Sequence, residues 1–423
     1  MPHDGNQGTT RADKSSDDVT VRGLSPSLFD LRSLPAAFYD NPFPTYHRLR
    51  REAPVLRCAD GSVLLTRHAD LMRVYRDTKS FSSDKKIQFA PVFGEGSPLF
   101  EHHTSSLVFN DPPLHTRVRR AIGDALSVKM VERLAPVVRS LVARLIDDLA
   151  GRQRVDLIAE FASAIPVEVI GGMLAIPVAE RAPLREWSLA ILGALEFAAD
   201  QRVLERGNAA VTEFVAYLQR RIALRRATLA AADDDIMARL LRASGGADGL
   251  TASELVHQCI FLLNAGHETT TNLIGNAIAL LAEAPEARAC LLSGPEGARA
   301  VVEEVLRLES PNQLGNRTAT MDVMLGDTAI SAGTVLTLCI GAANRDPEVF
   351  DAPDAFQPDR GGSGHLAFGY GIHTCAGLAV ARLEGQVALS ALFGRFPDLR
   401  ILDARRAHRA RFRGFTRLDA VLR

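Results

Sequence analysis

Cysteine is scarce in this sequence. The 423 residues include five, at Cys58, Cys259, Cys290, Cys339 and Cys375, and no two of them form a C-x-x-C pair. An odd number of scattered cysteines argues against a disulfide framework and a structural zinc site. Cys259 and Cys339 lie within apolar runs, where a buried and inert thiol is expected. Only Cys375 has unusual neighbours.

Charge of one sign and long apolar runs are also lacking. The formal net charge is -1, with acidic and basic residues mixed throughout, so neither a nucleic-acid partner nor a polybasic membrane surface is expected. No stretch reaches about 18 uninterrupted apolar residues, and the polar N-terminus lacks the apolar core of a signal peptide. We therefore expect a cytoplasmic protein that has no membrane span and acts on small molecules. Residues 1–20 are expected to be a disordered tail.

Helical periodicity dominates what is present. Apolar residues recur at spacings of three and four over residues 131–232, and Thr251 with Glu254 fits a capping box. The capping box predicts a long helix from Ala252 to about residue 284, roughly 50 Å at 1.5 Å per residue. Gly266 and the threonines after it favour a local bulge or kink. Residues 321–343 read as short strands joined by "GD" and "AG" turns.

The stretch "HLAFGYGIHTCAGLAVAR" places Cys375 between glycines and an apolar helix. Gly369 and Gly371 allow left-handed or tightly bulged backbone. A thiol at a helix N-terminus is expected to have a lowered pKa, which favours the thiolate that a metal ligand or a nucleophile needs. The local sequence leaves three interpretations open: a metal ligand, a nucleophile with His373 as its base, or a structural cysteine.

This stretch resembles the heme-binding loop of the cytochrome P450 family, F-G-x-G-x-H-x-C-x-G. Every fixed position is matched, by Phe368, Gly369, Gly371, His373, Cys375 and Gly377. The resemblance implies that Cys375 is the axial thiolate ligand of heme b. It also implies that Phe368 packs by the sulfur, that Gly377 lets the helix approach the porphyrin, and that His373 binds a propionate.

The segment "NAGHETTTN" in the predicted long helix resembles the oxygen-activation element of the same family. The resemblance implies that Ala265 and Gly266 leave room for dioxygen, and that Glu268 and Thr269 are the acid and alcohol that deliver protons. A zinc-protease motif is excluded, because the position of its second histidine is occupied by Thr271.

Three further motifs match the family, and each alone is also compatible with ordinary surface charges. The segment "EEVLR" provides an i, i+3 pair and "FQPDR" a third member, with an implied structural role for Glu304, Arg307 and Arg360. Burying the heme propionates requires cationic partners. The resemblance assigns that role to His115, Arg119 and Arg317.

The resemblance implies a mainly α fold with a small β-rich lobe, a long central helix over the heme, and a single heme domain over residues 21–423. The implied function is a heme-thiolate monooxygenase that inserts one oxygen atom from O2 into a small hydrophobic substrate. A peroxide-driven peroxygenase and a non-catalytic heme-binding sensor are the alternatives. No dinucleotide fingerprint or iron–sulfur spacing is present, so electrons from NAD(P)H must arrive through separate partners. The resemblance to soluble bacterial members implies that these are a ferredoxin and an NAD(P)H-dependent ferredoxin reductase.

Substrate contacts are the least determined part of the sequence. Family position places Leu263, Leu314 and Phe415 in a largely apolar substrate pocket. Two further sets of residues each allow two interpretations. His102, His103 and Arg413 either bind a substrate carboxylate or lie at the surface, and Arg117, Arg120 and Arg382 either form a docking face for the electron donor or are solvated charges.

Overall fold

The computed structural model describes residues 29–126, 128–245, 249–361 and 364–422. Its α-helices are α2 (Ala36–Asp40), α3 (Phe43–Glu52), α4 (His68–Arg76), α5 (Lys86–Phe93), α6 (Pro98–Ser105), α7 (Leu114–Ala125), α8 (Val128–Leu149), α9 (Ala164–Met173), α10 (Leu184–Gly193), α11 (Gln201–Ala227), α12 (Ile236–Arg242), α13 (Ala252–Ala282), α14 (Pro285–Leu292), α15 (Pro295–Leu308), α16 (Ile340–Ala343) and α17 (Leu378–Arg395). The predicted tail at residues 1–20 lies outside the described residues.

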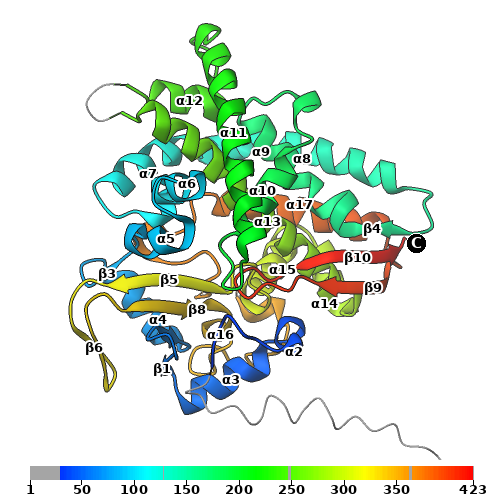
Figure 1. The fold of residues 1–423 in the computed structure, drawn as a ribbon. Helices are drawn as coiled ribbons and strands as arrows, with labels where there is room; N and C mark the ends of the chain where they lie inside the picture. The colour runs from blue at the N-terminus through cyan, green and yellow to red at the C-terminus, as the bar shows by residue number, and fades with distance from the viewer. Residues whose placement is uncertain (1–28, 127, 246–248, 362–363, 423) are drawn as a thin grey trace, which may run out of the picture.

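Short strands form the β-rich part. The largest sheet has the order β1 (Val55–Arg57), β2 (Val63–Leu65), β8 (Val335–Cys339), β5 (Leu314–Ala319) and β3 (Phe81–Ser82), and only β2 and β8 pair in parallel. A second sheet joins β4 (Val155–Asp156), β10 (Phe415–Val421) and β9 (Arg400–Arg406). Most helices lie above the larger sheet, and α2, α3, α4 and α16 lie below it (Figure 1), which confirms the predicted fold class of mainly α with a small β-rich lobe.

The predicted strands and turns between residues 321 and 343 are also present. β6 (Val323–Leu325) and β7 (Thr328–Ile330) form a two-stranded hairpin, and β8 follows. Gly326 in the "GD" turn has a φ of 56°, and Gly333 in the "AG" turn has a φ of 83°. Both values lie in the left-handed region that glycine adopts without strain.

Helix α13 runs through the middle of the molecule (Figure 1). It begins with the predicted capping box: the Glu254 amide donates to Thr251 Oγ1 at 3.1 Å, and the Thr251 amide donates to Glu254 Oε2 at 2.8 Å. The helix has 31 residues, which span about 46 Å. It packs against α9, α10 and α17, so it forms the axis around which the other helices are arranged.

The predicted bulge near Gly266 is wrong, because α13 is a continuous α-helix through this segment, whereas the kink stays a prediction. Thr269 Oγ1 donates to the Ala265 carbonyl at 2.7 Å, and Thr271 Oγ1 donates to the His267 carbonyl at 2.9 Å. The hydroxyls thus bond to carbonyls one turn back that keep their helical geometry. The threonine hydroxyls therefore share these carbonyls with the backbone amides, and the helix is not interrupted.

Apolar side chains from many helices pack around α13. Its residues Leu255, Ile260, Ile274 and Ile278 are buried, in one cluster with Phe161, Phe214 and Phe393 from other elements. Burial of each such side chain contributes about 1.5–3 kcal/mol, so α13 is held rigidly. Among the described helices, none combines the length and hydropathy needed to cross a membrane.

Candidate active site

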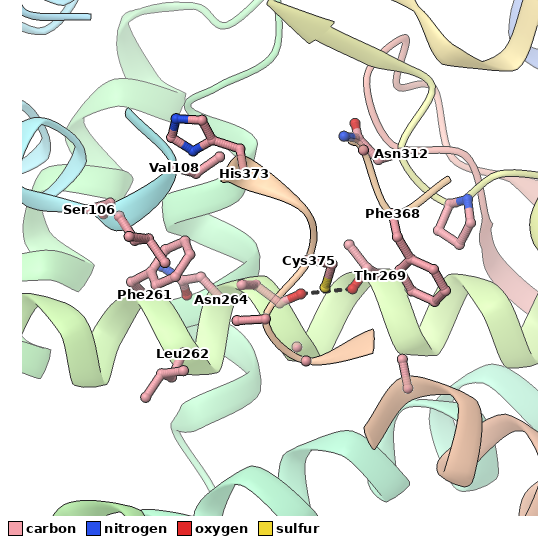
Figure 2. A pocket seen from close by; sticks show the side chains of 18 of the residues that line it. Ser106, Val108, Phe261, Leu262, Asn264, Thr269, Asn312, Phe368, His373 and Cys375 are labelled. Atoms are coloured by element: carbon pink, nitrogen blue, oxygen red, sulfur yellow. Dashed lines mark hydrogen bonds between the residues drawn. The ribbon is translucent and has the colours of Figure 1, made fainter. Parts of the chain in front are cut away.

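A large cavity lies between α13 and the loop that precedes α17. Cys375 on the loop and Thr269 on α13 both line it (Figure 2). The rest of the wall is mostly apolar and comes from widely separated segments, including Leu107, Phe109, Ile170, Met173, Leu192, Phe261, Leu262, Leu314 and Phe412. A mostly apolar cavity with a few converging polar groups is the usual form of a small-molecule site.

The Cys375 loop has the tight backbone that its glycines predict. Gly369 and Gly371 have φ values of 65° and 73°. The Cys375 amide donates to the Phe368 carbonyl at 2.9 Å, which closes the loop. A Cβ at Gly371 would lie 2.8 Å from the Tyr75 carbonyl oxygen, so this position excludes any side chain. The loop is therefore pressed against the C-terminal end of α4 and presents its cysteine to the cavity.

The protein alone does not favour the Cys375 thiolate, contrary to the prediction from the helix terminus. Burial raises the pKa of the Cys375 thiol and outweighs the Gly377 amide, Arg119 and Arg382, which lower it. Helix α17 begins only at Leu378. A metal cation bonded to the sulfur would supply the missing stabilisation of the thiolate, since a coordinating thiol is deprotonated.

Cationic and imidazole groups converge beside this loop. His115 and Arg119 lie one turn apart on α7, Arg317 is on β5, and His373 is in the short helix Gly371–His373. The His115 and His373 rings have centroids 4.3 Å apart. Both ring nitrogens of His115 and Nε2 of His373 are buried without a hydrogen-bond partner among the described residues. Burial, together with Arg317, His115 and Arg119, lowers the pKa of His373 to about 2.

Lys85 belongs to the same cluster, and the sequence analysis missed it. It is 1 % exposed, and its Nζ donates to Thr318 Oγ1 at 3.2 Å. Burial and the neighbouring Arg317 lower its pKa to about 7, against the opposite pull of Asp111. In the sequence it stands in "SSDKKIQF", which reads as a solvated surface segment, so no local signal marks it.

These groups fit heme. Within the described chain, no carboxylate forms an ion pair with Lys85, Arg119 or Arg317, although buried cations are ordinarily paired. The two propionates of a heme would supply the missing anions and accept hydrogen bonds from the orphaned imidazoles. A Cβ at Gly377 would meet no atom within 4 Å, so that part of the wall is open to a flat ligand.

The three residues assigned a structural role lie together behind the loop. Arg307 donates to both carboxylate oxygens of Glu304, at 2.8 and 2.7 Å, and Arg360 Nε lies 3.3 Å from Glu304 Oε1. Arg307 also donates to the carbonyls of Asn344, Pro353 and Ala355, at 2.9, 2.7 and 3.0 Å. One buried guanidinium thereby joins α15 to the irregular segment before the Cys375 loop.

The predicted proton-delivery pair is only partly directed into the cavity. Thr269 lines it, whereas Glu268 does not and forms an ion pair with Arg409. Burial raises the pKa of Glu268, Arg409 opposes that shift, and Glu196 adds to it. Sequence reasoning missed Arg409, which is 141 residues away along the chain.

Ala265 and Gly266 both line the cavity, but the missing side chain of Gly266 has another neighbour. A Cβ there would lie 2.4 Å from Ile170 Cδ1 of α9. The glycine therefore permits close packing of α9 on α13. This contact explains the glycine by packing and does not support the prediction that Gly266 leaves room for dioxygen.

Of the three residues predicted to line the substrate pocket, only Leu314 does so. The predictions for Leu263 and Phe415 are wrong. Among the described residues that form the wall, Leu262 and Phe412 lie where these two were expected. Successive helical residues differ by about 100°, so Leu263 points into the protein core. Phe415 is already part of β10, where its ring lies 3.8 Å from the Arg406 guanidinium carbon.

The residues predicted either to bind a substrate carboxylate or to lie at the surface are also placed. His102 and His103 are each 2 % exposed and line the cavity, so they are not surface residues. Arg413 is buried and donates to Glu309 Oε2 at 2.7 Å, which leaves it no part in the cavity wall.

Comparison with known proteins agrees with this fold and site. Residues 191–292 and 298–400 match the family model described as Cytochrome P450. The chain is 37 % identical over 382 residues to Cytochrome P450 107B1 of Saccharopolyspora erythraea, covering 88 % of this chain and 92 % of that protein. It is 36 % identical to vitamin D(3) 25-hydroxylase of Pseudonocardia autotrophica, covering 86 % and 88 %. The solved structure of P450BioI with an acyl carrier protein ligated to hexadec-9Z-enoic acid has a TM-score of 0.86 at 30 % identity, covering 92 % of this chain and 100 % of that chain.

The fold and these comparisons define the class, a family of enzymes that bind heme through a cysteine thiolate. The chain belongs to the cytochrome P450 family and is a P450 monooxygenase.

Proposed function

We propose that this enzyme inserts one oxygen atom from O2 into a small hydrophobic substrate, with electrons from NAD(P)H delivered by a ferredoxin and a ferredoxin reductase. The observation that carries the proposal is the meeting of the Cys375 thiol and the Thr269 hydroxyl in one apolar cavity beside unpaired cations. We include in the proposal that residues 21–423 form a single heme domain and that the protein is cytoplasmic.

A heme bound through the Cys375 sulfur would supply the reductive activation of dioxygen. The chain's own contribution begins with binding: Arg119 and Arg317 neutralise the propionates, and His115 and His373 donate hydrogen bonds to them. Phe368 lies next to the loop and lines the same cavity. Its ring shields the sulfur from water, which keeps the ligand electron-rich.

Thr269 and Glu268 control protons. Thr269 Oγ1 donates its proton to the Ala265 carbonyl, so its lone pairs face the cavity as acceptors, and rotation of the hydroxyl turns it into a donor. Glu268 has a raised pKa and holds a proton more readily than an exposed carboxyl. Because Arg409 holds it away from the cavity, transfer to Thr269 Oγ1 requires release of that ion pair or a bridging water.

The apolar wall supports a hydrophobic substrate. The similar proteins named above act on or bind vitamin D(3) and a carrier-bound hexadecenoic acid, which are both largely apolar. These molecules indicate the chemical class and do not identify the substrate of this chain.

Only one of the three arginines predicted to form a docking face for the electron donor is exposed and outside the ion pairs described here. Arg117 is paired with Glu254 at 2.6 Å and Arg382 with Glu303 at 2.6 Å, whereas Arg120 is exposed. Arg120→Glu therefore tests docking. A slower reduction rate with a steeper salt dependence supports it, and an unchanged rate contradicts it.

Reconstitution with labelled dioxygen tests the reaction itself. Product that carries one labelled oxygen atom, formed with NAD(P)H, ferredoxin and reductase, supports the proposal. Equal turnover with peroxide alone indicates a peroxygenase, and no turnover under either condition indicates a sensor.

Substitution of Thr269 tests the proton pathway. Thr269→Ala is expected to retain heme while NAD(P)H oxidation becomes uncoupled from product. Thr271→Ala is the matched control, because Thr271 makes the same hydrogen bond one turn back but does not line the cavity. Equal coupling in the two variants contradicts the role of Thr269.

A further inference from the structure

A group of buried nitrogen and oxygen atoms lies in the otherwise apolar part of the cavity wall. It consists of His102 and His103, at the end of α6, and Asn264 on α13, and we call it the polar cluster. Asn264 precedes Thr269 by five residues, which is about 7–8 Å along the helix axis. The polar cluster is thus set apart from the Thr269 hydroxyl, which marks the proposed oxygen-activation end of the cavity.

Each member of the polar cluster has an unused polar atom. Asn264 Nδ2 lies 3.3 Å from His102 Nε2. His102 Nδ1, His103 Nε2 and Asn264 Oδ1 are buried without a hydrogen-bond partner among the described residues. More than nine in ten buried polar groups in proteins are paired, because an unpaired one destabilises the fold. Three such atoms at one wall of a ligand cavity indicate that a ligand pairs with them.

The surroundings of the histidines exclude a charged state. The His103 ring lies among Phe89, Phe93 and Phe109, with centroids 5.8, 5.2 and 5.8 Å away. Burial, with Arg411 and His257, lowers the pKa of His103 to about 3. The His102 ring lies 5.7 Å from that of His257, and its pKa is lowered by burial, His103 and His257.

Neutral imidazoles determine which chemical group the polar cluster can accept. Each neutral ring has one N–H donor and one acceptor nitrogen, and the free atom of Asn264 is an acceptor. A hydroxyl both donates and accepts, and a carbonyl accepts from an imidazole N–H. A carboxylate would have to shed its water beside groups that carry no charge. Arg411, a cation that also lines the cavity, already donates to the carbonyls of Leu195 and Leu314, at 3.2 and 3.0 Å.

On the basis of the proposed function, we propose that the polar cluster binds an uncharged hydroxyl or carbonyl oxygen of the substrate. The substrate is then an apolar molecule that carries such an oxygen about 7–8 Å or more from the carbon that is oxidised. His102, His103 and Asn264 determine specificity by fixing the far end of the molecule, while the apolar wall encloses its body.

Three rigid probes of one shape test this proposal: para-cyclohexylphenol, cyclohexylbenzene and para-cyclohexylbenzoate. Their dissociation constants are measured on the heme-loaded protein by calorimetry and by the spin-state change of the iron. In the wild type we expect the phenol to bind and the benzoate to bind more weakly. Failure of the phenol to bind, or tighter binding of the benzoate, overturns the proposal.

Variants then locate the contact. His102→Phe and His103→Phe keep a ring but remove its nitrogens, and each should weaken the phenol about tenfold relative to cyclohexylbenzene. His257→Phe is the matched control, since His257 is a buried neighbour that does not line the cavity, and it should leave that ratio unchanged. Asn264→Leu provides a second removal of a polar atom if a histidine variant does not fold.

Parallel changes for the phenol and the hydrocarbon in these variants would overturn the proposal, because they would mean that the polar cluster only packs or holds water. Failure of the proposed function would look different. It would leave the binding ratios intact while labelled oxygen failed to appear in a product.

Discussion

Removal of the buried Arg307 guanidinium tests how the irregular segment before the heme loop is held. The same helix provides two ion pairs with identical i, i+3 spacing and an N–O distance of 2.7 Å. Glu304 and Arg307 are 1 % and 2 % exposed, whereas Glu296 and Arg299 are 83 % and 59 % exposed. The perturbation is therefore Arg307→Met, with Arg299→Met as its matched control.

The expected magnitudes differ because of burial. Arg307→Met removes the main partner of the buried Glu304 carboxylate, which keeps only the Gln357 amide and Arg360 Nε, at 3.0 and 3.3 Å. Loss of one partner from a buried pair costs about 3–5 kcal/mol. The substitution also leaves the carbonyls of Asn344, Pro353 and Ala355 without the guanidinium that now bonds to them. Arg299→Met loses only an exposed pair, worth about 0.2–1 kcal/mol. The two variants should thus differ by at least about 2 kcal/mol.

Equilibrium urea unfolding followed by circular dichroism, with heme content measured alongside, gives both free energies. Arg307→Met should unfold at markedly lower urea and retain less heme, while Arg299→Met should match the wild type. Equal stability of the two variants would refute the reasoning that burial makes this pair essential.

Two further predictions rest on single contacts. Gly266→Ala should destabilise the protein by about 1 kcal/mol, because the clash with Ile170 exceeds the gain in helix propensity. In an Ile170→Val background, which lacks the clashing Cδ1, the same substitution should stabilise, and an unchanged sign in thermal unfolding would refute the contact. Glu384, buried on α17, has its pKa raised by burial to about 8, so the folded state keeps a proton that the unfolded state loses above its usual pKa. Between pH 6 and 8 the free energy of unfolding of the wild type should therefore fall by about 2 kcal/mol relative to that of Glu384→Gln. A difference between the two proteins that does not change with pH would contradict this.

Features set by neighbouring residues in the sequence could be predicted. The capping box of Thr251 and Glu254 and the positive φ of Gly369 and Gly371 depend on local chemistry, and the structure has both. The order of helices and strands followed from periodicity in the same way. The prediction of a bulge near Gly266 was wrong because local propensity could not show that the threonine hydroxyls bond within the helix.

Features set by contacts between distant segments could not be predicted. The burial of Lys85 depends on β5, and the partner of Glu268 lies on the C-terminal loop. Whether Leu263 faces the cavity depends on the rotational phase of α13, and the prediction was off by one residue. Whether Phe415 does so depends on where β10 begins, and that prediction was off by three residues. Motif position alone does not have that resolution.

The spectrum of the reduced protein with carbon monoxide tests the central claim most directly. The wild type should show the band characteristic of thiolate-ligated heme iron, and Cys375→Ala should lose it while circular dichroism shows an intact fold. Cys290→Ala, a change of the same kind on α14, should keep the band. A wild-type protein without this band, or a folded Cys375→Ala variant that retains it, would contradict the assignment of Cys375 as the heme ligand.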